Sequence, residues 1–87
     1  MSSPENSPPP VSPGEILREE FMIPLNITVQ KLAKDLQVSE KTLLQVLAGR
    51  RRVSRAMAHK LHMRLKTSTE FWLNSQIRYD RQKLAWW

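Results

Sequence analysis

Two short stretches with helical spacing of apolar residues follow each other in the middle of this chain, and only three residues separate them. In the first stretch, Thr28 is a good N-cap and the apolar residues after it share one helical face. In the second, Ser39 is the next N-cap, and Gly49 suits the position just beyond a helix end. We expect helices over residues 29–36 and 40–48. A connection this short is the spacing of a helix-turn-helix.

Three further helices complete the expected fold. Pro13 suits the first position of a helix, which we expect to stop before Pro24 because proline disfavours the α conformation in the preceding residue. Ser54 caps a fourth helix, and Thr67 or Ser68 caps a fifth. The chain has 87 residues, enough for one small domain with one modest core. The sequence therefore predicts an all-α, five-helix domain.

The first twelve residues differ in composition from the rest. They are rich in Ser and Pro and contain one apolar residue after Met1, too few to offset the entropy of ordering the segment. We expect a disordered arm over residues 1–12, a helix-turn-helix core over residues 13–66 and a C-terminal helical segment over residues 67–87. Cysteine is absent, and the chain shows no signal-peptide pattern or membrane-length apolar run. We therefore expect a soluble, intracellular protein that does not bind a membrane.

Positive charge is concentrated in the middle of the chain. Residues 30–66 hold ten Lys or Arg against only Asp35 and Glu40, whereas residues 1–29 are acidic and residues 67–87 are nearly balanced. A local excess of this kind indicates a polyanionic partner. An anionic membrane surface is the lesser candidate; nucleic acid is the leading one, and it is the partner we expect.

The second short helix carries the residues predicted to read DNA. In a helix-turn-helix this helix lies in the major groove, with its N-terminal residues at the base edges. Lys41 can donate to guanine, Gln45 can bond to adenine through both ends of its amide, and Leu44 could pack on a thymine methyl group. Glu40 has two interpretations, because it could accept from cytosine or complement the helix dipole. The predicted base contacts are Ser39, Glu40, Lys41, Thr42, Leu44 and Gln45.

A run of three arginines follows this helix directly. No acidic residue adjoins the run, so its charges repel one another and favour an anion such as a phosphate. The first turn of the preceding helix can also present N–H groups to a phosphate, although capping alone explains Thr28 equally well. The predicted phosphate contacts are Thr28, Gln30, Arg50, Arg51 and Arg52.

The last helix carries two apolar stripes, and only one of them can face the core of the domain itself. One stripe holds Leu73, Ile77 and Leu84, and the other holds Trp72, Tyr79 and Trp86. An uncovered stripe is usually covered by a second copy, so we predict a homodimer. An alternative is a base-stacking platform, as in a module that binds RNA or single strands. The predicted dimer interface consists of Trp72, Gln76, Tyr79 and Trp86.

Residues that could support catalysis or metal binding are sparse. His59 and His62 are three residues apart, but no third ligand lies at a suitable spacing. No nucleophile turn, glycine-rich phosphate loop or pair of catalytic carboxylates is recognisable. We therefore predict a protein that is not an enzyme and that holds no metal or other cofactor.

Three motifs in combination resemble one family. "PGEIL", "GRRRVS" and "EFWLNSQIRYD" are similar to motifs of the HigA-type antitoxins, also called VapI-like, of the Xre class of lambda-repressor-like helix-turn-helix proteins. The resemblance covers about residues 12–82. It implies a bacterial, cytoplasmic, dimeric five-helix protein that represses its own operon by binding double-stranded operator DNA. It also implies a partner, a RelE/HigB-like toxin that cleaves mRNA.

Carried over to this chain, the groove-helix contacts of the family fall on Ser39, Lys41, Thr42 and Gln45, its loop phosphate contacts on Arg50 and Arg51, and its dimer helix on residues 69–82. This chain departs from the family in three places. Val29 replaces a glutamine that helps to hold a phosphate, Gln37 replaces a glycine in the turn, and Ala48 replaces an asparagine near the DNA backbone. A stand-alone Xre-family repressor without a toxin is the alternative function.

Overall fold

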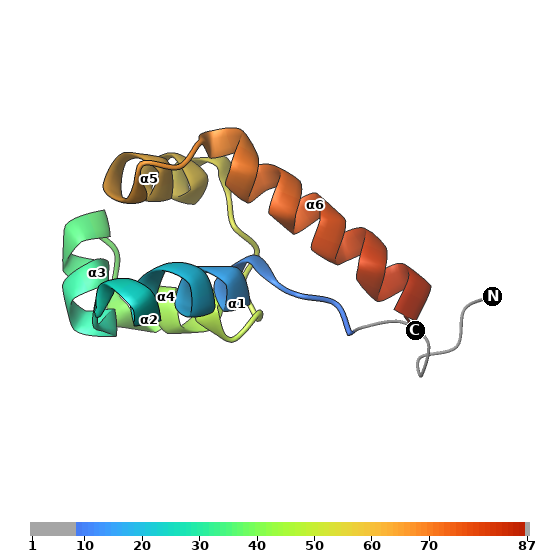
Figure 1. The fold of residues 1–87 in the computed structure, drawn as a ribbon, viewed down its shortest axis with the longest axis horizontal. Coiled ribbons are helices and arrows are strands. Elements are labelled where there is room, and N and C mark those ends of the chain that lie inside the picture. The colour runs from blue at the N-terminus through green and yellow to red at the C-terminus, as the bar shows by residue number, and fades with distance from the viewer. Residues whose placement is uncertain (1–8, 87) are drawn as a thin grey trace.

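The structure, a computed structural model, describes residues 9–86 and shows them as an all-helical domain (Figure 1). Its first three elements run into one another without a break, so the described residues form five helical runs, as the sequence predicts. The predicted arm falls largely on residues 1–8, which lie outside the described part. The elements are α1 (Pro13–Leu17), the π-helix η2 (Arg18–Met22), α2 (Ile23–Leu25), α3 (Val29–Leu36), α4 (Glu40–Leu47), α5 (Arg55–Leu65) and α6 (Thr69–Trp86).

Short polar side chains begin the helices. The hydroxyls of Thr28, Ser39 and Ser54 each accept a hydrogen bond from a backbone N–H in the first turn, which confirms the predicted caps. At α6 it is Ser68 that accepts, from the Phe71 N–H at 3.0 Å. These bonds satisfy N–H groups that a helix leaves without a partner at its start.

Ser12 corrects the predicted end of the arm. This residue is 7% exposed, and its hydroxyl caps α1 by accepting from the Glu15 N–H at 3.2 Å. Ser12 therefore belongs to the folded domain, and the boundary predicted after residue 12 is wrong by at least this residue.

The first helical run continues past Pro24, so the prediction that it stops there is wrong. The run widens into a π-helix just before the proline, and the Ile23 N–H bonds to the carbonyl of Arg18, five residues back. Pro24 then lies in the first turn of α2, where its missing N–H is tolerated. The run ends at Asn26, whose φ of 55° provides the left-handed turn expected at this residue.

Left-handed backbone also shapes the turns around α4. Gln37 ends α3 with φ of 58°, so this chain keeps a positive φ where the resemblance expects a glycine. Val38 then donates from its N–H to the Ala33 carbonyl at 3.0 Å. Gly49, with φ of 75°, follows α4 as predicted. Both ends of α4 are thus set by turns of defined geometry.

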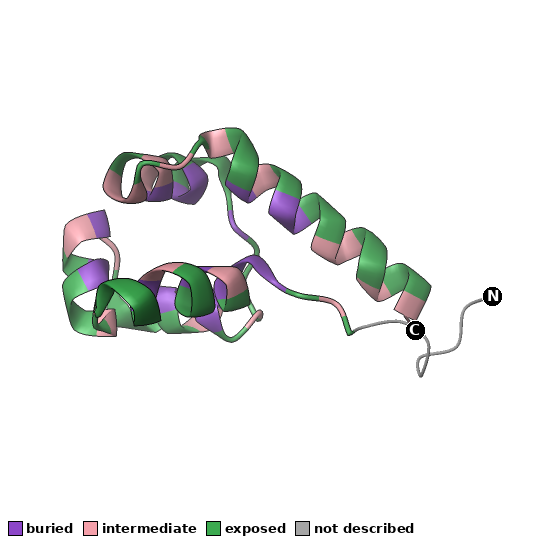
Figure 2. Ribbon diagram, in the orientation of Figure 1, coloured by how far each residue is buried: buried purple, intermediate pink, exposed green. Residues whose placement is uncertain are grey.

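The core lies where the helices converge, and the buried parts of the ribbon point toward it (Figure 2). Trp72 of α6 is fully buried, its ring centroid lies 5.6 Å from that of Phe21, and its indole N–H donates to the Thr67 hydroxyl at 2.7 Å. The largest fully buried side chains come from α1, α3, α4, α5 and α6; they are Leu17, Leu32, Leu43, Val46, Leu61 and Trp72.

Gly14 lets α1 rest directly on the backbone of α4. A Cβ atom at this position would lie 2.0 Å from the carbonyl oxygen of Val46 and 2.7 Å from Cα of Leu47. Only a glycine permits so close an approach. The position of α4 in the domain therefore depends on this one residue of α1.

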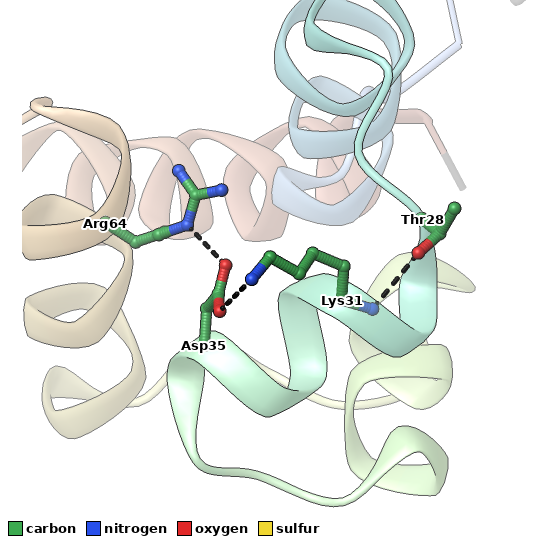
Figure 3. A network of polar contacts seen from close by, with 4 residues as sticks. All are labelled: Thr28, Lys31, Asp35 and Arg64. Carbon is green, nitrogen blue, oxygen red and sulfur yellow. Dashed lines mark hydrogen bonds and ion pairs between the residues drawn. The ribbon is translucent and has the colours of Figure 1, made fainter.

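An ion-pair network joins α3 to α5 (Figure 3). Asp35 accepts from Nε of Arg64 at 2.8 Å and lies 3.2 Å from Nζ of Lys31. The hydrogen bond from Arg64 is the main reason that the pKa of Asp35 is lowered from 3.8. Desolvation opposes this shift, and Lys31 adds to it.

Candidate nucleic-acid interface

The outer face of α4 is exposed to solvent. The predicted inner face, Leu43, Val46 and Leu47, is buried in the core. On the opposite side Leu44 is 51% exposed, which is unusual for a large apolar side chain. An open groove of 560 Å³ runs along this face and is lined by Lys41, Leu44, Gln45, Ala48 and Arg50. Three of the residues predicted to reach base edges, Lys41, Leu44 and Gln45, therefore line one accessible surface.

Two hydroxyls at the start of α4 are bonded to each other. Ser39 Oγ accepts from the Thr42 N–H at 3.0 Å and donates to Thr42 Oγ1 at 2.9 Å. The Ser39 hydroxyl is therefore used both as a cap and as a donor. Glu40 occupies the first turn, where a carboxylate complements the helix dipole.

Gln45 is held by the arginine run. Its Oε1 accepts from Nε of Arg51 at 3.0 Å, and its backbone carbonyl accepts from the N–H groups of Arg50 and Arg51 at 2.9 and 3.2 Å. Arg50 and Arg51 are both exposed. Arg51, a predicted phosphate contact, is thus hydrogen-bonded to Gln45, a predicted base contact. The sequence spacing alone did not indicate this bond.

The segment over residues 49–54, here called the arginine loop, is anchored to α6 through Gln76. The Gln76 side chain accepts from the Val53 N–H at 2.9 Å and donates to Oδ1 of Asp80 at 3.1 Å. Gln76 is 4% exposed, so this anchor lies inside the domain. The loop is consequently held at a defined place beside α4.

Arg52 pairs with Asp80, so the expectation of three unopposed arginines is wrong for this residue. Partial burial by itself would raise the pKa of Asp80, but hydrogen bonds from Arg52 and Gln76 outweigh it and lower that pKa from 3.8. The two partners lie 28 residues apart, which is why the sequence run showed no acidic neighbour. Arg50 and Arg51 remain the predicted phosphate contacts with the least local neutralisation.

The start of α3 lies beside the ion-pair network of Figure 3. Thr28 Oγ1 accepts from the Lys31 N–H at 3.1 Å, so this hydroxyl serves as a cap. Gln30 is exposed, whereas Val29 is half-buried and packs against the core. Gln30, whose side chain is exposed, stays a predicted phosphate contact.

The buried stripe of α6 corrects part of the predicted dimer interface. Trp72 is fully buried in the chain's own core and Gln76 anchors the arginine loop, so the prediction is wrong for both. Tyr79 and Trp86 are half-buried, and Lys83 lies 5.0 Å from the Tyr79 ring centroid. Apolar side chains of the rest of the helix face outward, namely Phe71 at 42%, Ile77 at 46% and Leu84 at 83% exposure.

Residues 9–86 contain neither a metal-binding cluster nor a membrane-spanning helix. No three His, Cys, Asp or Glu side chains of this part converge as metal ligands would. None of its helices combines the length and the apolar character needed to cross a membrane.

The helix α4 exposes a face with polar side chains, packs against α3 across a tight turn and is followed by an anchored basic loop. These features define a helix-turn-helix domain of the DNA-binding class. Known proteins agree. An uncharacterized HTH-type transcriptional regulator of Haemophilus influenzae is 42% identical over 71 residues, covering 82% of this chain and 66% of that protein. Antitoxin HigA-1 of Vibrio cholerae is 38% identical, covering 82% of this chain and 67% of the antitoxin.

Solved structures show the same relationship. The Pseudomonas aeruginosa antitoxin HigA with the higBA promoter is 37% identical with a TM-score of 0.82, over 86% of this chain and 82% of that one. No protein-family model matches the sequence. The chain spans 63% to 70% of the length of the first curated relatives it matches. This chain belongs to the HigA-type family of helix-turn-helix antitoxins.

Proposed function

We propose that this chain is the antitoxin of a type II toxin–antitoxin pair and represses its own operon by binding operator DNA as a dimer in the bacterial cytoplasm. The observation that carries the DNA-binding part is the exposed outer face of α4 beside the arginine loop, which Gln76 anchors. In this arrangement α4 contacts base edges, and Arg50 and Arg51 contact phosphates. The promoter-bound HigA of Pseudomonas aeruginosa supports the proposal.

A dimer explains the apolar surface of α6. Ile77 and Leu84 are exposed, and Tyr79 and Trp86 are only half-buried. The two pairs lie on opposite sides of α6, and an apolar stripe left exposed on a helix is usually covered by a partner; a second copy would place two α4 helices on one duplex. Two such helices about 34 Å apart would read a pseudo-palindromic site.

DNA binding is tested with two substitutions on a duplex taken from upstream of the gene. Lys41→Ala should relax sequence preference, because it removes a base contact and leaves the arginine loop intact. Arg50→Ala should weaken binding to specific and random duplexes alike and lower the salt slope by about one unit. Arg18→Ala, which removes an exposed arginine from η2, is the matched control and should change neither quantity. Equal effects of Lys41→Ala on specific and random duplexes would refute the groove assignment.

Toxin neutralisation rests on the family, whose members are named as antitoxins, and on no contact within the chain. The small reading frame adjacent to the gene should arrest growth when induced alone, and co-expression of this chain should relieve the arrest. The two proteins should then co-purify. An adjacent protein that is expressed and soluble but harmless would leave a stand-alone repressor as the function.

A further inference from the structure

Two side-chain hydrogen bonds on α4 determine which atoms its outer face offers to a base, and this inference rests on the proposed DNA binding. In the first, Nε of Arg51 donates to Oε1 of Gln45 at 3.0 Å, while the Arg51 backbone N–H bonds to the Gln45 carbonyl. The oxygen and nitrogen of an amide lie at opposite ends of a planar group. Because the oxygen is turned toward the arginine loop, the Nε2 donors are turned away from it.

In the second, Ser39 Oγ donates its hydrogen to Thr42 Oγ1 at 2.9 Å. The Thr42 oxygen therefore already accepts a hydrogen bond from the protein, whereas its own hydrogen is left to donate. Ser39 has no hydrogen left to donate, because its single O–H is used in this bond.

Lys41 adds an ammonium group, which can only donate, to the same exposed face. The carboxylate of Glu40 is the exception in α4, but Glu40 lies about 160° from Thr42 and about 140° from Gln45 around the helix axis. The side of α4 that carries Lys41, Thr42 and Gln45 thus presents mainly donors, because each of its two side-chain acceptor oxygens already accepts one hydrogen bond within the protein.

We propose that Arg51 is a positioning residue that orients the Gln45 amide, so that this face of α4 presents hydrogen-bond donors and selects guanine in each half-site. Guanine offers two adjacent acceptors, N7 and O6, in the major groove, whereas adenine offers one acceptor beside an amino donor, cytosine an amino donor, and thymine the single acceptor O4 beside a methyl group. The adenine contact expected for Gln45 from sequence requires Oε1 to accept from the base. In the structure that oxygen is turned to Arg51.

Selection from a pool of duplexes with a random central segment identifies the site bound by the full chain, and guanine should occur at base pairs facing α4. On that site, Gln45→Glu keeps an oxygen for Arg51 but replaces the outward donor with an acceptor. This variant should move the preference at one base pair from guanine to cytosine, with a change of about ten-fold or more in the ratio of Kd values.

Arg51→Lys keeps the charge but lacks the planar guanidinium. It should reduce guanine preference by about ten-fold while affinity for random duplex stays within about two-fold. Arg18→Lys is the matched control, because Arg18 is an exposed arginine of η2 that lies outside α4 and the arginine loop, and it should leave the preference unchanged. Thermal melts establish that each variant is folded.

Three results would overturn the inference. Selected sites with adenine, cytosine or thymine in place of guanine facing α4 would do so, as would a Gln45→Glu variant with unchanged base preference, or equal effects of Arg51→Lys and Arg18→Lys on discrimination. All three still show sequence-specific duplex binding, so the proposed function survives them. If no sequence is enriched and no duplex binds, DNA binding itself is refuted and this inference fails with it.

Discussion

Replacing Gly14 with alanine adds only one methyl group but should destabilise the domain strongly. The added Cβ would lie 2.0 Å from the Val46 carbonyl oxygen, and ordinary van der Waals contact begins at 3.4 Å. The backbones of α1 and α4 would have to separate by about 1.4 Å, because neither obstructing atom belongs to a side chain that can rotate away. Overpacking of this kind costs about 3 kcal/mol or more.

The net effect includes a gain from helix propensity. Alanine is favoured over glycine in a helix by up to about 1 kcal/mol, so the free energy of unfolding should fall by about 2 kcal/mol or more. For a domain of 60–100 residues, each kcal/mol lowers Tm by roughly 4–8 °C, so Tm should fall by about 8–16 °C or more.

Gly49→Ala is the control for this prediction. Its Cβ would meet no atom closer than 3.5 Å, so the substitution introduces only the strain of a φ of 75°, about 1 kcal/mol. Thermal unfolding followed by circular dichroism at one fixed protein concentration measures both variants. A Gly14→Ala variant as stable as the wild type, or no less stable than Gly49→Ala, would refute the close packing of α1 on α4.

Three further predictions concern single side chains. The pKa of Asp35 is lowered in the folded state, chiefly by Arg64. The stability that ionised Asp35 gives the fold should therefore be complete above pH 3.8 and be lost as the pH falls through the lowered folded-state pKa. In thermal melts at acidic pH, Asp35→Asn should show a smaller loss of stability than the wild type. Gln37→Gly should raise the free energy of unfolding by about 1 kcal/mol in denaturant titrations, because it relieves a φ of 58°. Gln76→Ala should lower the free energy of unfolding by about 1–3 kcal/mol, because it leaves the buried Val53 N–H without its acceptor. An unchanged free energy of unfolding would contradict the anchoring role of Gln76.

Local signals predicted most of the fold. The caps at Thr28, Ser39 and Ser54 follow from the chemistry of their own first turns, and Asn26 and Gly49 follow from their tolerance of positive φ. The outer and inner faces of α4 were also predictable, because its buried apolar residues recur at helical spacing and lie on a single face of the helix.

The failures arise where distant parts of the chain decide the outcome. Helical spacing shows two stripes on α6 but not which one meets the core, and the buried stripe includes the polar residue Gln76 because the arginine loop needs its amide. The Arg52–Asp80 pair spans 28 residues and left no local pattern.

The widened turn before Pro24 was missed because the rule for the residue before a proline assumes an ordinary α-helix.

Fluorescence anisotropy on two labelled duplexes measures whether this chain binds operator DNA in a sequence-specific way. One duplex comes from directly upstream of the gene and the other has the same composition in scrambled order, and both are titrated with the full chain at several salt concentrations. The account predicts binding of two protomers per upstream duplex, at least about 10³-fold tighter than to the scrambled duplex, with affinity falling steeply as salt rises. Equal affinity for the two duplexes, or binding that salt does not change, would contradict it.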